Sequence, residues 1–353
     1  MPLETIVQKT IEYLAVPSVV GYEKLFIDYL YQDFIRLGLS VQKHDGILEV
    51  NGKQPHAHIV TAHLDRHGLI SLGDGTYAYA AEYINNTRYN EDHVSSQAML
   101  RAIGKRFEGE LMYAYNPATG DHLGEGLIER APSFGQGGDA YFSIQNMSDI
   151  PKGTPIAYAR KAEIDKDYFK GQIDNTLSLG VIYTLFQNGF QGTALLSCEE
   201  EIGKSWQYIT RWLAQNSIRT HKLFVLDTSP YREKDPVDCG WVTLRSRDKS
   251  GIFNSDLLTT LKDKCDTLNI PYQIKDEFFL SLGLSVDDLG STELGRIIQN
   301  TNGKWSGITV QIPTTEYHTS YETTSKQSIA HYYRLLSNLL IATPATIKTL
   351  EKQ

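Results

Sequence analysis

Three consecutive carboxylates, Glu199, Glu200 and Glu201, follow a mostly apolar run at residues 193–198, and Gly203 comes shortly after them. Adjacent acids repel one another unless a cation holds them together. Neighbours on an extended chain point to opposite faces, so we expect Glu200 and Glu201 to have different surroundings and different roles. An acidic run can equally be a solvated loop, so the other polar residues of the chain must decide between the two interpretations.

His63 and Asp65 follow a second apolar run, at residues 58–62, which is typical of a buried strand. Residues two apart on an extended segment point the same way. This spacing suits an imidazole that binds a metal ion with one nitrogen while a carboxylate holds the other nitrogen. Alone, however, the pair is more often a surface contact.

Further candidates lie where expected elements begin or end. Asp227 and His318 follow expected strands, and Asp174 precedes an expected helix. Open α/β sheets bind their ligands at the carboxyl ends of the strands. The candidate set comprises His63, Asp174, Glu200, Glu201, Asp227 and His318. Two histidines and three carboxylates can hold two divalent ions with one carboxylate bridging. Such a pair activates water and polarises a carbonyl, and one carboxylate is left as general base, so we predict a hydrolase.

Regular alternation of helices and strands should position these groups. Apolar spacing predicts helices at residues 3–15 and 22–37, with Pro17 to Gly21 separating them. After residue 164, strands are expected at 193–198, 222–226 and 307–312, and helices at about 176–185, 206–213, 254–268 and 325–342. This order predicts an α/β fold with a mostly parallel sheet and helices on both faces.

Residues 71–164 have a different texture. Glycines such as Gly73, Gly75, Gly135, Gly137 and Gly138 separate short alternating segments, which indicates β-structure with tight turns. Residues 92–107 are the exception and have helical spacing. We therefore expect a catalytic α/β domain from residues 1–70 and 165–353, and an inserted small β-rich domain at 71–164 that serves assembly.

Composition narrows the class of protein. The 353 residues exceed a usual single core, and the net charge of −8 disfavours nucleic acid as a partner. No apolar run is long enough for a membrane span, and the N-terminus lacks a signal-peptide pattern. The three cysteines are widely spaced, which disfavours a disulfide framework. These features predict a cytoplasmic protein that does not bind membranes.

The order of the motifs resembles the tetrahedral aminopeptidases, metallopeptidase family 42, a family of dizinc exopeptidases that includes glutamyl and deblocking aminopeptidases. The resemblance runs through nearly the whole chain. It is carried by H-x-D at His63, the long β-rich insertion, D-N at Asp174, E-E-x-G at Glu200, Asp227, and H-T-S-x-E at His318. The segments Ser18–Glu23 and Asp45–Gly46 are also similar to family motifs.

The resemblance implies a role for each candidate. His63 and Asp227 would each bind one metal ion, Asp174 would bridge the pair, and Glu201 and His318 would complete the ligand set. Glu200 would be the general base, and Asp65 would orient His63. It also implies two divalent ions, zinc or alternatively cobalt, an aminopeptidase acting on short peptides, and a homo-oligomer that in this family is a dodecamer.

Three motifs depart from the family pattern. Arg66 and His67 stand where the family has Asp-Glu-hydrophobe-Gly, Thr176 replaces an arginine after D-N, and Glu316 replaces an arginine before Tyr317. None of these changes removes an implied ligand. Because the Arg66 charge is expected close to the metal ions, the changes bear on substrate preference and assembly.

Other functions fit parts of the same pattern. A dizinc carboxypeptidase or an N-acyl-amino-acid deacylase would use the same ligands, but the place of the insertion disfavours both. A catalytically inactive scaffold relative is a third hypothesis, which the complete ligand set disfavours. A glycosidase with Glu200 and Glu201 as its acid pair would need carboxyls about 5–9.5 Å apart across one substrate. No histidine pattern in the sequence supports Cys198 as a thiol nucleophile, so we expect Cys198 to be a small buried residue.

Overall fold

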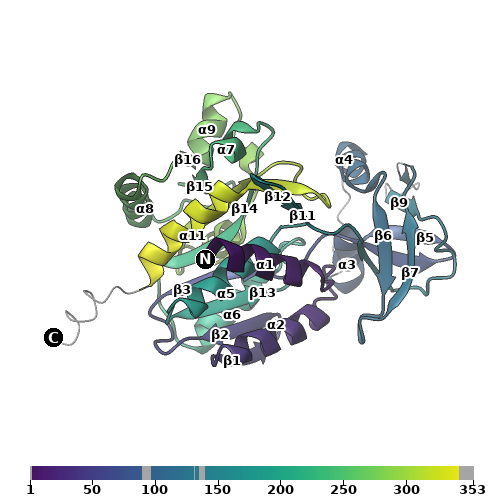
Figure 1. Cartoon of the computed structure of the whole chain (residues 1–353), viewed down its shortest axis with the longest axis horizontal. Helices are drawn as coiled ribbons and strands as arrows, with labels where there is room; N and C mark the ends of the chain where they lie inside the picture. Colours follow the sequence, from purple (N-terminus) through teal and green to yellow (C-terminus); the bar gives the residue numbers. More distant parts are fainter. Residues whose placement is uncertain (1, 90–96, 131, 135–139, 342–353) are drawn as a thin grey trace.

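The computed structural model describes residues 2–89, 97–130, 132–134 and 140–341. These residues form a mixed α/β fold, which confirms the predicted class at that level. A large body contains an eight-stranded sheet with helices, and a seven-stranded sheet lies to one side of it (Figure 1). A short three-stranded sheet is formed by β11 (Glu163–Ile164), β12 (Tyr168–Gly171) and β18 (Glu322–Ser325).

The eight-stranded sheet is mixed and has the order β1-β2-β13-β3-β14-β17-β15-β16. Strand β3 lies parallel to β13 and β14, β14 lies parallel to β17, and β15 lies parallel to β16. The other three pairs are antiparallel. Its strands are β1 (Ser40–His44), β2 (Ile47–Asn51), β3 (Ile59–His63), β13 (Thr193–Ser197), β14 (Leu223–Pro230), β15 (Val242–Leu244), β16 (Tyr272–Ile274) and β17 (Gly307–Thr314).

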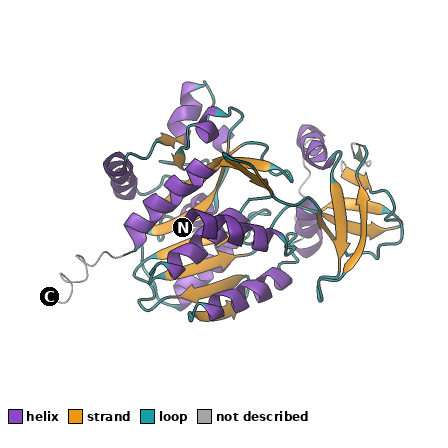
Figure 2. Cartoon of the chain, in the orientation of Figure 1, coloured by secondary structure: helices purple, strands orange, loops and turns teal. Residues whose placement is uncertain are grey.

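Most of the helices in the described part of the chain belong to this body (Figure 2). They are α1 (Pro2–Leu14), α2 (Lys24–Arg36), α5 (Thr176–Gln187), α6 (Ser205–Gln215), α7 (Asp235–Asp238), α8 (Ser255–Leu268), α9 (Lys275–Ser281), α10 (Glu293–Asn300), α11 (Lys326–Leu340) and the 3₁₀ turn η1 (Val286–Leu289). Side chains cap the start of some of these helices: the Asn254 side chain accepts the backbone N–H groups of Asp256 and Leu257 in α8, and the Ser325 side chain caps α11. The helix expected to end at residue 342 ends at Leu340, and residue 342 lies outside the described residues.

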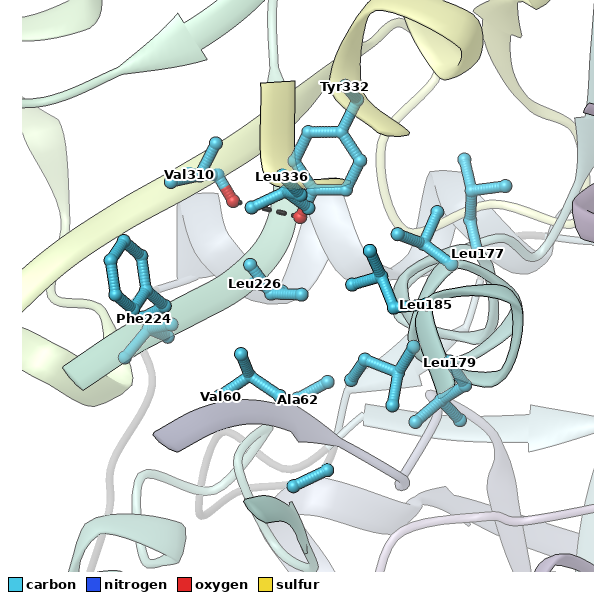
Figure 3. Packing of buried hydrophobic residues seen from close by; sticks show 14 of the residues in the cluster. Val60, Ala62, Leu177, Leu179, Leu185, Phe224, Leu226, Val310, Tyr332 and Leu336 are labelled. Atoms are coloured by element: carbon cyan, nitrogen blue, oxygen red, sulfur yellow. Dashed lines mark hydrogen bonds between the residues drawn. The ribbon is translucent and has the colours of Figure 1, made fainter. Parts of the chain in front are cut away.

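The core of the large body follows from the two-residue period of its strands. Val60 and Ala62 of β3 pack with side chains of α5 and α11 in one cluster (Figure 3), whereas Ile59 packs with α6 in another. Tyr332 of α11 also donates a hydrogen bond to the Val310 carbonyl of β17 (3.0 Å). Helix α5 is buried from Thr176 to Phe186, because it lies between the sheet and α1.

The seven-stranded sheet has its own hydrophobic cluster. Its order is β7-β6-β10-β4-β5-β9-β8. The strands are β4 (Leu69–Gly73), β5 (Thr76–Tyr79), β6 (Leu111–Tyr115), β7 (His122–Leu127), β8 (Ser133–Phe134), β9 (Ala140–Ser143) and β10 (Pro155–Tyr158). The glycines at 135, 137 and 138 lie outside the described residues.

Two helices accompany this sheet. Helix α4 (Gln97–Phe107) matches the later part of the helix expected at 92–107, and residues 92–96 lie outside the described part. Helix α3 (Ala80–Arg88) was not predicted. It follows β5 directly, without a glycine or proline at the boundary, and it buries Ala80, Ala81 and Ile84 in the cluster.

None of the helices in the described part of the chain has the length and apolar character needed to span a membrane. The three cysteines carry free thiols. Cys198 is buried, as expected, and burial raises the pKa of its thiol, which disfavours a nucleophilic role.

Candidate metal centre

Asp174 lies between two imidazoles and is buried. Its Oδ1 is 3.0 Å from Nε2 of His63, and its Oδ2 is 3.4 Å from Nε2 of His318. Burial alone would raise the pKa of the Asp174 carboxyl, but the two adjacent histidines lower it. Each carboxylate oxygen therefore faces a different histidine, as a bridging carboxylate would.

A further carboxylate accompanies each histidine. Oδ1 of Asp227 is 3.6 Å from Nε2 of His63, and Oε2 of Glu201 is 3.7 Å from Nε2 of His318. The five residues expected as ligands thus lie in two groups that share Asp174, and we call each group a half-site. Both half-sites lie near the carboxyl end of β3, where His63 is the last residue and pairs with Ser197 of the parallel strand β13.

The sequence predicted that Asp227 follows the end of its strand, but Asp227 lies within strand β14. Strand β14 continues to Pro230, because it pairs with β17 over eight residues, through Thr314. The carboxylate of Asp227 accepts a hydrogen bond from the Thr228 N–H (2.7 Å) and remains partly exposed. The side chain therefore leaves the sheet from within a strand.

The three glutamates lie in a turn, and the expected strand alternation between them is wrong. Strand β13 ends at Ser197, and Glu199 has a left-handed backbone with φ of 63°. Glu199 is buried, and its carboxylate is held by Arg88, Tyr89 and Tyr208. Glu199 is therefore tied into the structure, while the turn directs the next two glutamates to different surroundings.

Asp65 holds this turn in place. Its two carboxylate oxygens accept the backbone N–H groups of Glu200 and Glu201, each at 2.9 Å. Nδ1 of His63 lies 3.1 Å from the main-chain carbonyl of Asp65 and 3.8 Å from its carboxylate. The closest contact that orients the His63 ring is therefore the main chain of Asp65, and the Asp65 carboxylate also positions the glutamate turn.

Glu200 points toward Arg296 of α10. Its Oε1 is 3.1 Å from the Arg296 guanidinium, and its side chain keeps 16% of its surface exposed. Burial raises the pKa of the Glu200 carboxyl, and Arg296 opposes that rise. Gly203 lets the guanidinium approach, because a Cβ there would lie 3.1 Å from it, and its backbone has φ of 70°. Glu200 thus combines partial exposure with a fixed orientation.

Glu322 was not assigned a role from the sequence. It is buried, and its Oε2 accepts the backbone N–H of Asp174 (2.8 Å) while its Oε1 accepts that of His318 (2.6 Å). The H-T-S-x-E spacing, which ends at Glu322, was the signal that could have identified it. The Glu322 carboxylate therefore fixes the backbone of Asp174, which the two half-sites share, and the backbone of His318.

His67 was also missed, although the sequence marks it as a departure from the family pattern. It is buried, its Nε2 lies 2.8 Å from Oε2 of Glu201, and its ring centroid lies 3.8 Å from that of His318. Arg66, by contrast, does not point at the cluster. Its guanidinium donates hydrogen bonds to the Ser18 hydroxyl and to the carbonyls of Leu14 and Val16.

These side chains fit a divalent metal ion. Within the described cluster, the buried atoms without a hydrogen-bond partner are His67 Nε2, Glu201 Oε1 and both ring nitrogens of His318. Unpaired buried polar atoms are costly in a folded protein. Imidazole nitrogens and carboxylate oxygens are ordinary ligands of zinc and similar ions, and a cation would also offset the repulsion among the clustered carboxylates. The donor atoms of His63, Asp174 and Glu201 lie within 4.8 Å of one another.

Residues 145–335, more than half of the chain, match the model of the M42 glutamyl aminopeptidases. The chain belongs to the M42 glutamyl aminopeptidase family. This M42 protein is therefore a peptide hydrolase. No curated protein sequence matches it.

Solved structures of peptidases share the fold of this M42 protein. The TET1 peptidase of Pyrococcus horikoshii has 14% identity and a TM-score of 0.70, covering 96% of this chain and 100% of that chain. An aminopeptidase of Desulfurococcus kamchatkensis has 13% identity and a TM-score of 0.72, covering 98% of each chain. A TET aminopeptidase of a Thaumarchaeota archaeon has 16% identity and a TM-score of 0.71, covering 97% of this chain and 98% of that chain.

The candidate metal centre of this M42 peptidase opens into a cavity of about 300 Å³. His67 and Tyr79 line it from the side of the seven-stranded sheet, together with Arg106 of α4. Glu201 and Arg296 line it from the large body. The cavity therefore receives charged groups of both signs next to the candidate ligands.

Proposed function

We propose that this M42 protein is a metal-dependent aminopeptidase that removes N-terminal residues from short peptides at a dinuclear metal centre. The observation that carries the proposal is the position of Asp174, whose two oxygens face His63 and His318. The ligands are the five residues expected from the sequence: His63, Asp174, Glu201, Asp227 and His318. Zinc suits this mixture of imidazole and carboxylate donors, and cobalt is the alternative.

The metal ions, when bound, activate a water molecule and polarise the scissile carbonyl. Glu200 accepts a proton from the attacking water and then delivers it to the leaving amine. Its partial exposure and its contact with Arg296 support this role, because a general base must be reachable and oriented. Burial raises the pKa of the Glu200 carboxyl well above its ordinary value, which is the direction expected of a carboxyl that acts as a general base.

Two carboxylates position the reacting groups. Asp65 holds the backbone of Glu200 and Glu201, so it controls the angle between the base and a metal ligand. Glu322 holds the backbone of Asp174 and His318. Because neither residue needs to touch the substrate, both are positioning residues.

The preferred bond is tested with matched peptides. The first substrates are dipeptide and tripeptide amides with a free N-terminus. They are compared with the same peptides carrying an acetylated N-terminus, and with peptides that have a free C-terminus. The proposal expects release of the N-terminal residue from the free amines only, and loss of this activity when a chelator removes the metal. Release of C-terminal residues, or of the acyl group, would favour the carboxypeptidase or deacylase alternative instead.

We also propose that the chain forms a homo-oligomer, with a dodecamer as the assembly to test. The Pyrococcus horikoshii TET1 peptidase can assemble into a tetrahedron or a large octahedral shell. The inserted β-rich domain at 71–164 is proposed to carry assembly contacts, and its exposed Leu111 and Leu123 support this. Replacing both with Lys should lower the sedimentation coefficient, whereas Lys at the exposed Leu280 and Leu282 of the other body should not. The reverse result would place assembly on the large body.

A further inference from the structure

We propose that His67 is a metal ligand and that it binds the same ion as Glu201 and His318. The inference rests on the proposed dinuclear centre and adds a third imidazole to it. The five ligands expected from the family pattern do not include this position, where the pattern has a hydrophobic residue.

The geometry places His67 within the ligand cluster. Single donor atoms of His67, Glu201 and His318 all lie within 4.8 Å of one another. Nε2 of His67 lies 2.8 Å from Oε2 of Glu201, and the His67 and His318 rings are inclined at 60° with centroids 3.8 Å apart. A single ion can therefore reach all three side chains without a change of backbone.

Each of the same three side chains has a buried atom without a hydrogen-bond partner among the described residues. His67 is 5% exposed, and its Nε2 makes no hydrogen bond despite its proximity to the carboxylate. Oε1 of Glu201 and Nε2 of His318 are unpartnered as well. Without a cation, three polar side chains would be buried against one another with their lone pairs unsatisfied, at a cost in free energy. A cation accepts lone pairs from all three.

Tyr79 orients the His67 ring. The Tyr79 hydroxyl lies 2.6 Å from Nδ1 of His67, and the two rings stack with an interplanar angle of 26°. A metal-bound imidazole usually donates its other ring N–H to a nearby oxygen, which selects the tautomer. With Tyr79 as that acceptor, the lone pair of Nε2 is directed toward Glu201.

The two half-sites then differ in their number of protein ligands. The ion beside His318 has four: Asp174, Glu201, His318 and His67. The ion beside His63 has three, counting Asp174 and Asp227. Four protein ligands leave a tetrahedral ion without a free position, whereas three keep one open for water or substrate. The His67 half-site should hold its metal more tightly, and the His63 half-site should carry the open position.

Zinc X-ray absorption on the unmodified, fully loaded protein provides the first test. The proposal expects three imidazoles shared between two zinc ions, and two imidazoles in the His67→Ile variant. His58→Ile is the matched control, since it removes a half-buried histidine just before the other end of β3 and should leave the count at three. Because the unmodified protein gives a count by itself, the test stands even if His67→Ile does not fold.

Metal affinity provides the second test. Loss of a residue that hydrogen-bonds a metal ligand typically weakens metal binding by ~10–100-fold. Loss of a ligand itself should therefore weaken metal binding at one site by at least ~100-fold. Competition with a chromophoric chelator should show this loss for one of the two ions in His67→Ile, with the other ion unaffected. The His58→Ile control should retain both affinities.

The outcomes separate this inference from the proposed function. An active enzyme that holds two zinc ions with only two imidazoles overturns the role of His67 and leaves the aminopeptidase proposal intact. Three imidazoles in a fully loaded protein that hydrolyses no peptide support the role of His67 and overturn the aminopeptidase proposal. Equal affinities in His67→Ile and the unmodified protein also overturn the role of His67.

Discussion

The backbone N–H of Asp174 donates a 2.8 Å hydrogen bond to the buried carboxylate of Glu322. The second oxygen of Glu322 accepts the backbone N–H of His318 at 2.6 Å. Asp174 and His318 are 148 and four positions from Glu322 in the chain. A residue outside the candidate ligand set therefore fixes the backbone from which two candidate ligands extend.

Glu322→Gln should weaken metal binding. Glutamine offers one acceptor oxygen, and its NH₂ group cannot accept the second backbone N–H, so one ligand loses its support. We expect metal affinity to fall by ~10–100-fold and the free energy of unfolding to fall by about 1.5–3 kcal/mol. Chelator competition and urea unfolding measure the two effects. Glu316→Gln, at an exposed position in the loop before β18, is the control, and equal affinities in both variants would contradict the prediction.

Glu200→Gln and Glu201→Gln should fail in different ways. Glutamine at 200 cannot accept the proton, so kcat should fall by at least ~10²–10⁴-fold with metal content retained. Glutamine at 201 weakens a metal site first, and activity should recover in part at high metal concentration. Metal analysis and kcat on the two variants check this difference. Near-normal turnover of fully loaded Glu200→Gln would exclude Glu200 as the base.

Asp174→Ala should remove both metal ions together. The carboxylate is shared by the two half-sites, and without it two cations would repel each other at short range. Metal analysis after dialysis should show loss of both ions from the chain, with no measurable peptidase activity. The exposed Asp121→Ala should keep both ions. Retention of one ion at full affinity in Asp174→Ala would argue against bridging.

Arg296→Leu should lower kcat by roughly 10-fold or more, through loss of orientation of the proposed base. Arg296 contacts Glu200 and no candidate metal ligand in the described structure, so metal content should be unchanged. Arg296→Lys should restore part of kcat, because an ammonium can still contact the carboxylate at one oxygen. A larger effect on KM than on kcat would instead indicate that Arg296 binds the substrate.

Lys275 should make stability depend on pH. It is buried, its Nζ donates to the Ser229 hydroxyl (2.7 Å) and the Pro230 carbonyl (2.9 Å), and burial lowers its pKa well below the ordinary value. Between that lowered pKa and about 10.4, the unfolded chain binds one more proton than the native one. The free energy of unfolding should therefore rise with pH, by up to about 1.4 kcal/mol per pH unit.

Lys275→Met removes this contribution. Urea unfolding of both proteins from about pH 7 to about pH 9, below the ordinary pKa of lysine, should show a difference in stability that grows in favour of the unmodified protein as pH rises. If the difference stays constant over that range, Lys275 keeps its proton in the folded state.

The sequence by itself determined many of the helices and strands and identified the five candidate ligands that the structure brings together. Buried strands such as β3 and β13, and the helix α5 that follows the D-N motif at Asp174, are encoded in the local periodicity of apolar residues, which depends only on near neighbours. His63, Glu201, Asp227 and His318 follow expected strands and Asp174 precedes an expected helix, and these positions predicted that the five residues would gather at one edge of a sheet.

Only the tertiary structure decided what each of these side chains contacts. Glu199 is the first of three equivalent-looking glutamates, yet Arg88 and Tyr89 of a distant segment sequester it. His67 and Glu322 enter the site through contacts with residues more than 100 positions away. Local periodicity carries no information about such contacts, because they depend on how separate elements pack. The choice between a ligand, a base and a buried structural acid is therefore made by packing between elements.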